Sequence, residues 1–362
     1  MNSAEHYLIP FDTLREFCRR AYLAVGVPPD EARVVADLLA RADLRGVASH
    51  GVMRLPIYIE RLEKGYARRR CLLETLRHRG ATAHLAAHGS LGHVVAVRAM
   101  DLAVQLCREH GIGWVAVKDS GHFGVAGLLA MRALEHDFIG YVCSNSAPMM
   151  APFGGRQRII GNNPLAYAFP TLGRPPVVVD FSCSVVASGR LILARKKGER
   201  IPLGWAVDPQ GRPTEDPYLG YEGGGSLAPV GGHKGYGLAL AHEMLTALLG
   251  GGKWSAHIRS LYQEEPGGVQ GTCHSFMVLD PDCFVGRRRF KEELDCYIDF
   301  IKSSGTAAGV DEILLPGEPE HRSQERNLRR GVPLAAPTAR ELVELGRRLG
   351  IELEFPAVLQ RE

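Results

Sequence analysis

Long apolar runs, paired cysteines and an excess of one charge are all missing from this sequence. No apolar stretch is long enough to span a bilayer, and the first residues lack the basic-then-apolar pattern of a signal peptide. The net charge is only +3, from 43 basic and 40 acidic residues among 362. This balance argues against nucleic acid or an acidic membrane as a partner. The eight cysteines form no Cys-x-x-Cys pair, so we expect free thiols and a cytoplasmic location.

Four familiar catalytic and phosphate-binding motifs are also absent. No G-x-G-x-x-G stretch has the strand and helix flanks of a Rossmann fingerprint. Gly235 follows Lys234 where a P-loop needs Ser or Thr, and His242-Glu243 lacks the second histidine of H-E-x-x-H. No G-x-S-x-G elbow occurs. The sequence therefore predicts no metal site, no P-loop and no serine-hydrolase mechanism.

Apolar periodicity predicts helices and strands along the whole chain. Residues 11–45 predict two helices, with Asp30 capping the second. Further helices are expected at 55–64, 93–109, 125–136, 235–248, 284–302 and 338–350, the last capped by Thr338. Short apolar runs predict strands at 112–117, 138–143, 177–179, 275–280 and 313–315. The polar, Gly/Pro-rich segment 195–230 is expected to be a long ordered loop.

Two histidine-bearing segments carry the chemistry. The first, at 41–58, places Ser49, His50, Arg54 and Tyr58 where a helix ends; a purely structural polar helix end is the alternative. The second, at 119–124, places His122 after the strand 112–117, at an edge where ligands gather in α/β sheets. A histidine can deliver a proton and an arginine can bind a carboxylate. Together with a hydride donor, these groups meet the needs of a 2-oxo acid reductase.

A glycine-rich turn at 231–237 opens a predicted helix and contains Lys234. Free N–H groups at a helix N-terminus, with a lysine beside them, favour an anion such as a pyrophosphate. Glycines placed for close packing are the structural alternative.

Eight short segments, in order along the chain, resemble the type 2 malate/L-lactate dehydrogenase family. This family also holds sulfolactate, ureidoglycolate and diketogulonate oxidoreductases and cyclic imino-acid reductases. The segments are 49–58, 121–124, 145–155, 161–164, 180–182, 212–217, 232–239 and 316–318. Each segment is weak evidence alone, but eight in the same order are strong.

The resemblance implies an α/β fold with a mixed sheet and a non-Rossmann NAD(P)-binding domain. It implies an N-terminal helical part at 1–75, a cofactor-binding domain at 76–320 and a C-terminal helical part at 321–362 that packs with the first. It also implies a homodimer with the active site near the subunit interface, acting on a small carboxylate substrate with NAD or NADP.

Roles follow residue by residue from the same resemblance. His50, supported by Ser49, is the expected proton donor, and His122 is the second candidate. Arg54 and Tyr58 are expected to bind the substrate, with Arg54 on its carboxylate. The residues expected to line the dinucleotide site are Ser146, Asp180, Phe181, Ser182, His233, Lys234, Pro316, Gly317 and Glu318.

The chain departs from the family pattern at three positions. Asn162 stands where the family usually has Thr, and Cys183 where Thr or Ser is common. At Arg190, hydroxy-acid members tend to have Lys and imino-acid reductases Asp. The sequence therefore favours a 2-hydroxy/2-oxo acid oxidoreductase. A cyclic imino-acid reductase and a non-catalytic dinucleotide-binding protein are the alternatives.

Overall fold

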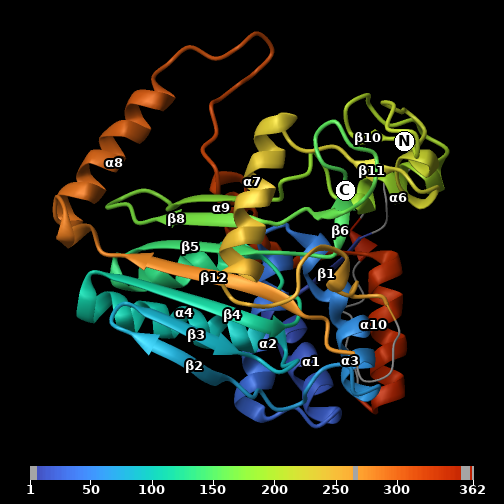
Figure 1. Cartoon of the computed structure of the whole chain (residues 1–362), viewed down its shortest axis with the longest axis horizontal. Coiled ribbons are helices and arrows are strands. Elements are labelled where there is room, and N and C mark those ends of the chain that lie inside the picture. Colours follow the sequence, from blue (N-terminus) through green and yellow to red (C-terminus); the bar gives the residue numbers. More distant parts are fainter. Residues whose placement is uncertain (1–5, 264–267, 352–358, 361–362) are drawn as a thin grey trace.

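A seven-stranded mixed sheet lies at the centre of the chain. The structure is a computed structural model and describes residues 6–263, 268–351 and 359–360. The strand order is β2-β3-β4-β12-β5-β8-β9 (Figure 1), in which β3 and β4 are parallel and the other neighbours antiparallel. The bounds are β2 Glu74–Arg79, β3 Thr82–Ala86, β4 Ile112–Ser120, β12 Thr272–Leu279, β5 Ile139–Ser144, β8 Leu165–Phe169 and β9 Val177–Phe181. The central strands are mostly buried on both faces, which explains their continuous apolar runs.

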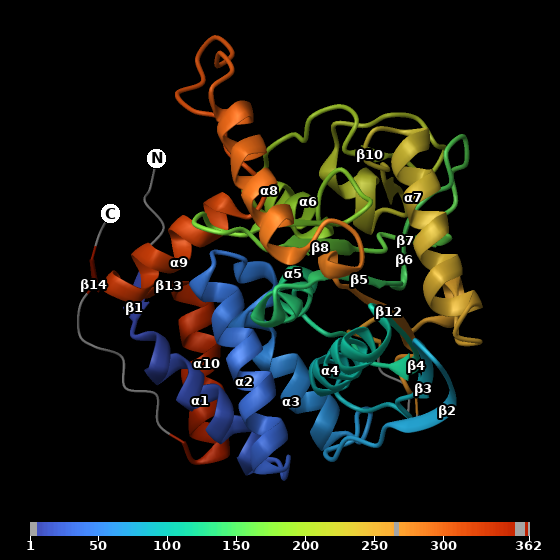
Figure 2. The ribbon, with the colours of Figure 1, turned by 90° about the vertical axis from the view of Figure 1, so that its left-hand side faces the viewer.

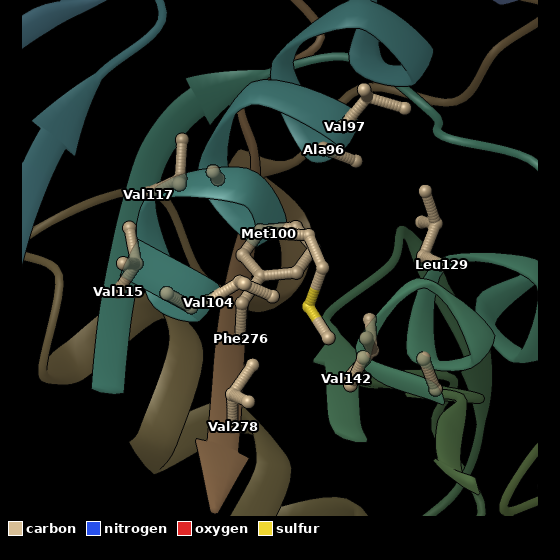
Figure 3. Close-up of a cluster of buried hydrophobic side chains, with 14 of the residues drawn as sticks. Ala96, Val97, Met100, Val104, Val115, Val117, Leu129, Val142, Phe276 and Val278 are labelled. Carbon is tan, nitrogen blue, oxygen red and sulfur yellow. The ribbon is translucent and has the colours of Figure 1, made fainter. Parts of the chain in front are cut away.

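Helices cover both faces of this sheet. On one face lie α4 (Gly92–His110), α5 (Ala126–Ala130) and η3 (Met131–His136), and on the other α7 (His233–Glu243) and η5 (Met244–Leu248) (Figure 2). Figure 3 shows Met100 of α4 packed beside Phe276 of β12 and Val104 in the first of these layers. Burial of such apolar side chains holds the helices against the sheet.

The two chain ends share a second hydrophobic core. β1 (His6–Ile9) pairs with β13 (Val332–Ala335) and β14 (Leu359–Gln360). Around it pack α1 (Phe11–Ala24), α2 (Pro29–Leu44), α3 (Leu55–Glu63) and α10 (Ala336–Leu349), side by side in Figure 2. Buried residues of this core come from both ends, among them Leu14, Leu39, Ile59 and Leu342.

A third, smaller core lies beyond β8 and β9. It contains the short sheet β10-β11-β6-β7, with β10 Ala206–Val207, β11 Ser226–Leu227, β6 Pro148–Met150 and β7 Ile160–Gly161. The helix α6 (Ser188–Lys197) and the π-helical turn η4 (Tyr218–Glu222) pack on it. The remaining elements are η1 Ala48–His50, η2 Val52–Arg54, η6 Ser255–His257, η7 Pro281–Cys283, α8 Arg287–Lys302 and α9 Glu318–Arg330.

The expected mixed α/β fold is confirmed, while several local predictions are wrong. Residues 313–315 form no strand; the chain there runs alongside β9, where the Val178 N–H donates to the Pro316 carbonyl at 3.0 Å. The segment 195–230 is not one loop, since it includes the end of α6 and η4. Neither Asp30 nor Thr338 caps a helix, because α2 already begins at Pro29 and α10 at Ala336, with Pro337 in its first turn.

No helix in the described ranges is long and apolar enough to cross a membrane. The boundaries at 75/76 and 320/321 stay a prediction, and α9 runs across the second of them.

Candidate active site

The turn after α2 is fastened to that helix by a buried carboxylate. Asp43, only 3% exposed, accepts the backbone N–H of Val52 at 2.6 Å. A Cβ on Gly51 would overlap this carboxylate, so glycine is required there. Burial raises the pKa of Asp43 to about 7, and the bond from Val52 only partly offsets this rise. Asp43 therefore sets the path of η1 and η2, which carry the predicted catalytic side chains.

The side chains of this turn are linked to one another. Ser49 Oγ lies 2.9 Å from His50 Nδ1, and Arg54 Nε donates to the Ser49 carbonyl at 2.9 Å. Arg54 Nη1 also donates to the hydroxyl of Tyr262, and the guanidinium lies 5.7 Å from the Tyr262 ring centroid. The predicted carboxylate-binding arginine is thus held in place on two sides.

The structure brings the two candidate proton donors together. His122 lies in the turn after β4, and its ring stacks on His50 with centroids 5.4 Å apart and planes at 24°. The Tyr58 hydroxyl, from α3, is 2.6 Å from His122 Nδ1. Histidines from two segments of the chain, 72 positions apart in sequence, therefore face the same space.

Hydrogen bonds determine which nitrogen of His122 carries the proton. The Gly124 N–H, which can only donate, reaches His122 Nδ1 at 3.3 Å. In the neutral ring Nδ1 is therefore the acceptor, the Tyr58 hydroxyl donates to it, and the proton sits on Nε2. The His122 N–H donates to Gln270 Oε1 at 3.0 Å, which fixes the turn itself.

Two further histidines complete the cluster. The His93 ring meets Tyr58 edge-on at 5.0 Å, and the ring is 1% exposed. His274 of β12 donates from Nε2 to the Gly121 carbonyl at 3.1 Å, and its Nδ1 lies 2.8 Å from Ser144 Oγ. His274 thus joins the turn that carries His122 to the end of β5. Neither His93 nor His274, which stands within an apolar strand, was among the site residues expected from the sequence.

Burial keeps these imidazoles neutral. It lowers the pKa of His50 to about 4, with a smaller contribution from Arg54. It lowers the pKa values of His93 and His274 to about 3. The pKa of His122 lies well below its ordinary value, first through burial and then through His50, His93 and Arg54. At neutral pH the free site therefore combines neutral histidines with two guanidinium charges, those of Arg54 and of Arg61, which lines the pocket.

A small pocket opens beside this cluster. Tyr58, His122, Ser90, Leu261 and Gln270 are among its lining residues. Leu261, Tyr262 and Gln270 come from the chain that follows η6, and sequence reasoning missed all three. Their only sequence signal is a mixed polar and aromatic composition in an irregular segment.

Part of the expected dinucleotide set lies around two asparagines. Ser146 Oγ donates to Asn162 Oδ1 at 2.8 Å, and the Ser146 N–H donates to Asn163 Oδ1 at 3.0 Å. The Cys183 N–H, next to Ser182, donates to the Asn162 carbonyl at 2.7 Å. Asn163 Nδ2 reaches Glu243 Oε2 at 2.8 Å and so ties the group to α7.

The start of α7 fits an anion. Gly231 and Gly232 both have positive φ, at 60° and 64°, and deliver the chain into the helix. His233 and Lys234 follow and are exposed. The first-turn N–H groups and the lysine cation suit the pyrophosphate of a dinucleotide.

The other expected dinucleotide residues lie at the end of β9. Asp180 Oδ2 accepts the Gly127 N–H at 2.7 Å, and Phe181 beside it is 38% exposed. Gly317 packs against Val178, where a Cβ would be only 2.9 Å from the Val178 Cβ. The Glu318 carboxylate is engaged by Lys302 Nζ at 2.8 Å and Arg322 Nη2 at 2.7 Å. Glu318 therefore acts here as an ion-pair anchor of α9.

Comparison with known proteins decides the family. The model of the malate/L-lactate dehydrogenase family matches residues 9–343. A malate dehydrogenase of Pyrococcus abyssi is 38% identical over 356 residues, covering 96% of this chain and 97% of that protein. The chain belongs to the malate/L-lactate dehydrogenase family. This confirms the resemblance carried by the eight segments.

Solved structures of the family share the whole architecture. The sulfolactate dehydrogenase of Methanocaldococcus jannaschii superposes with a TM-score of 0.89 at 34% identity, covering 96% of this chain and 98% of that one. A delta1-piperideine-2-carboxylate reductase of Pseudomonas syringae pvar. tomato superposes with a TM-score of 0.81 at 28% identity, covering 93% and 99%.

Two of the departures from the family pattern lie next to expected cofactor residues. Asn162 is the acceptor for the Ser146 hydroxyl. Cys183 is fully buried, with Sγ 3.2 Å from the Asn163 carbonyl. Burial raises the pKa of this thiol to about 12, so it stays protonated and acts as a packing group.

Proposed function

We propose that this protein is an NAD(P)-dependent dehydrogenase that interconverts a small 2-hydroxy acid and its 2-oxo acid. The observation that carries the proposal is the stacked His50–His122 pair, with Arg54 on the same turn as His50. This arrangement places a proton carrier beside a cation that suits a carboxylate. Family membership supports the same reaction class.

Arg54 is proposed to hold the substrate carboxylate. Its guanidinium is fixed by the Ser49 carbonyl and Tyr262, so the planar donor group has little freedom left to lose on binding. Tyr58 is proposed to act through its hydrogen bond to His122 at 2.6 Å.

His122 is proposed to move the proton. Its Nδ1 faces the Tyr58 hydroxyl, which can donate to the neutral ring and accept from the charged ring. Nε2 is therefore left for the substrate oxygen. His50, with Ser49 at its Nδ1, lies against His122 and shares its electrostatic environment.

The bound nicotinamide supplies the hydride, and NAD and NADP are both candidates. The residues proposed to hold the dinucleotide are those around Ser146 and Ser182, the end of β9, and the start of α7 at His233 and Lys234. The exposed histidine and lysine at the α7 N-terminus suit its pyrophosphate.

A homodimer in the cytoplasm completes the proposal. Apolar side chains are exposed along α7 and η5, including Leu238, Met244, Leu248 and Leu249, and such patches mark association surfaces. All eight cysteines are free, in keeping with a reducing compartment.

A substrate panel with NADH and NADPH tests the proposed reaction. Oxaloacetate, pyruvate, sulfopyruvate and a cyclic imino acid are offered, and oxidation of the cofactor is followed by absorbance. We expect turnover of at least one 2-oxo acid. His50→Ala and His122→Ala should each lose about 10²–10⁴-fold in rate while cofactor binding is largely kept. His78→Gln, an exposed change on β2, is the matched control and should stay active.

Three other outcomes of this experiment would contradict the proposed reaction. Reduction of the imine alone would move the chain to the imino-acid branch, as in the Pseudomonas relative. Tight cofactor binding without turnover of any compound would favour a non-catalytic protein. Full activity of both alanine variants would remove the histidines from the mechanism.

A further inference from the structure

Four imidazoles, one guanidinium and one phenol lie in one group centred on His122, and Tyr58 and His122 of this group line the pocket. They come from five elements and one turn of the chain. The members are His50 on η1, Arg54 on η2, Tyr58 on α3, His93 on α4, His122 after β4 and His274 on β12. The permanent charge within this histidine cluster is that of Arg54, and a second guanidinium, that of the buried Arg61, lines the pocket beside Tyr58 and His122.

The histidine cluster has no carboxylate partner in the described part of the chain. Among those residues, no hydrogen bond or ion pair joins a carboxylate to His50, His93, His122 or His274. Asp43 lies beneath the first turn, but its carboxylate is used by the Val52 N–H. Asp119 precedes the second turn, but among the described residues no hydrogen bond or ion pair joins its carboxylate to a histidine of the cluster. The cluster, in which His93 and His274 are buried and His50 and His122 are half-buried, therefore has no carboxylate as a counter-charge among the described residues.

A cluster of neutral imidazoles cannot supply the proton that reduction of a 2-oxo acid requires. A neutral imidazole is too weak an acid to protonate the oxygen of the substrate, so the ring must first become an imidazolium. In the free protein, burial and Arg54 hold the pKa values of His50 and His122 below neutrality. The proton must therefore be recruited by something that arrives with the reaction.

We propose that the substrate carboxylate supplies the missing negative charge, so that its binding at Arg54 brings one proton from solvent onto the His50–His122 pair. This inference rests on the proposed function. The overall reaction balances: the 2-oxo acid gains a hydride at C2 from the reduced nicotinamide and a proton at its oxygen from the histidine pair, giving the 2-hydroxy acid and the oxidised cofactor. The pair takes its proton at the binding step and is neutral again after the reduction.

The geometry allows one proton and no more. His50 Nδ1 lies 2.9 Å from the Ser49 hydroxyl, and His122 Nδ1 lies 2.6 Å from the Tyr58 hydroxyl. Each hydroxyl can turn from donor to acceptor when its ring gains a proton, and at His122 the Gly124 N–H must then give up its 3.3 Å contact with Nδ1. The two rings are 5.4 Å apart, so a second positive charge would be repelled by the first and by Arg54.

Isothermal titration calorimetry tests the proposal with oxamate, a non-reducible analogue of a small 2-oxo acid. The protein is first saturated with the reduced nicotinamide that it binds, and oxamate is titrated at pH 7.5 in buffers of small and large ionisation enthalpy. The dependence of the observed enthalpy on the buffer gives the number of protons taken up. We expect close to one proton per oxamate, and an oxamate Kd that rises about tenfold per pH unit above neutrality.

Variants locate the proton. His122→Gln or His50→Gln should abolish the uptake, and the variant that does so identifies the ring that holds the charge. His78→Gln on the exposed strand β2 should leave it unchanged. Uptake that persists in both cluster variants would place the proton elsewhere and overturn the proposal.

The result with the wild-type protein distinguishes failure of the proton uptake from failure of the proposed reaction. Oxamate binding with no proton uptake would overturn this inference and leave the proposed reaction standing. Absence of binding by oxamate, together with no turnover of any 2-oxo acid, would overturn both.

Discussion

Asp43 shows how a single residue can fix the turn that carries His50 and Arg54 at a cost in stability. Its carboxylate is buried, holds the Val52 N–H, and has no ion-pair partner among the described residues. Burial raises its pKa from an ordinary value of 3.8 to about 7. The folded protein therefore keeps this proton at pH values where the unfolded chain has released it.

The contribution of Asp43 makes the protein less stable as the pH rises. Because the folded pKa is raised, Asp43 lowers the free energy of unfolding progressively from about pH 4 to about pH 7, by at most about 4 kcal/mol in total. Asp43→Asn keeps an acceptor oxygen and cannot ionise. We expect the free energy of unfolding of this variant, relative to wild type, to be higher at pH 8 than at pH 5. Urea unfolding at both pH values measures this, and an equal difference at both would contradict it.

At the residue scale, the sequence identified the groups that stand in recognisable segments. Ser49, His50, Arg54, Tyr58 and His122 are indeed brought together. Their catalytic and binding roles remain predictions. Tyr262, His93 and His274 could not be found in this way, since only the folding of distant elements places them against Arg54, Tyr58 and Gly121.

At the element scale, the start of α4 packs directly on the turn that carries His122. A Cβ on Gly92 would overlap the carbonyl oxygens of Gly121 and His122. Alanine favours a helix over glycine by about 1 kcal/mol, but here the backbone overlap outweighs that gain. Gly92→Ala should therefore lower the free energy of unfolding by about 1–3 kcal/mol and reduce kcat.

A second helical glycine provides the matched control. Gly189 in α6 has no heavy atom within 4 Å of a built Cβ. Gly189→Ala should be neutral or stabilising by up to about 1 kcal/mol. Thermal unfolding and steady-state kinetics measure the stability and the kcat of both variants. A Gly92→Ala protein as stable and active as the Gly189→Ala protein would show that the α4 start can move without consequence.

Helices and strands were predicted correctly where the spacing of apolar residues follows the buried face of the element. The expected helix at 93–109 and the strands at 138–143 and 275–280 correspond to α4, β5 and β12. Prediction failed where structure depends on distant partners. β1 forms by pairing with β13 and β14 at the other end of the chain. α6 was missed because Lys and Arg dominate its exposed end and only Leu191 and Ala194 are buried.

At the scale of the whole molecule, an apolar surface remains along α7 and η5. Met244, Leu248 and Leu249 are each more than half exposed, at 53%, 57% and 58%. The same helix begins at His233 and Lys234, the proposed pyrophosphate position. Association of two copies through this surface would bury the apolar side chains and brace the cofactor end of the site.

This surface gives the prediction for assembly. Wild type should show twice the mass of the chain in size-exclusion chromatography with light scattering. Met244→Glu combined with Leu248→Glu should give the mass of a single chain and lower activity, because charges cannot be buried in an apolar contact. Leu172→Glu, at a 55% exposed loop position, is the control and should remain dimeric.

A second exposed apolar surface lies on α8, where Phe300 is 74% exposed and Tyr297 60%. Phe300→Glu tests whether the dimer forms through this surface instead. If the α7 double variant stays dimeric while Phe300→Glu becomes monomeric, the interface lies on α8. A wild-type chain that runs as a monomer would contradict the homodimer altogether. In that case, the histidine cluster and the N-terminus of α7 would have to form the whole active site within one chain.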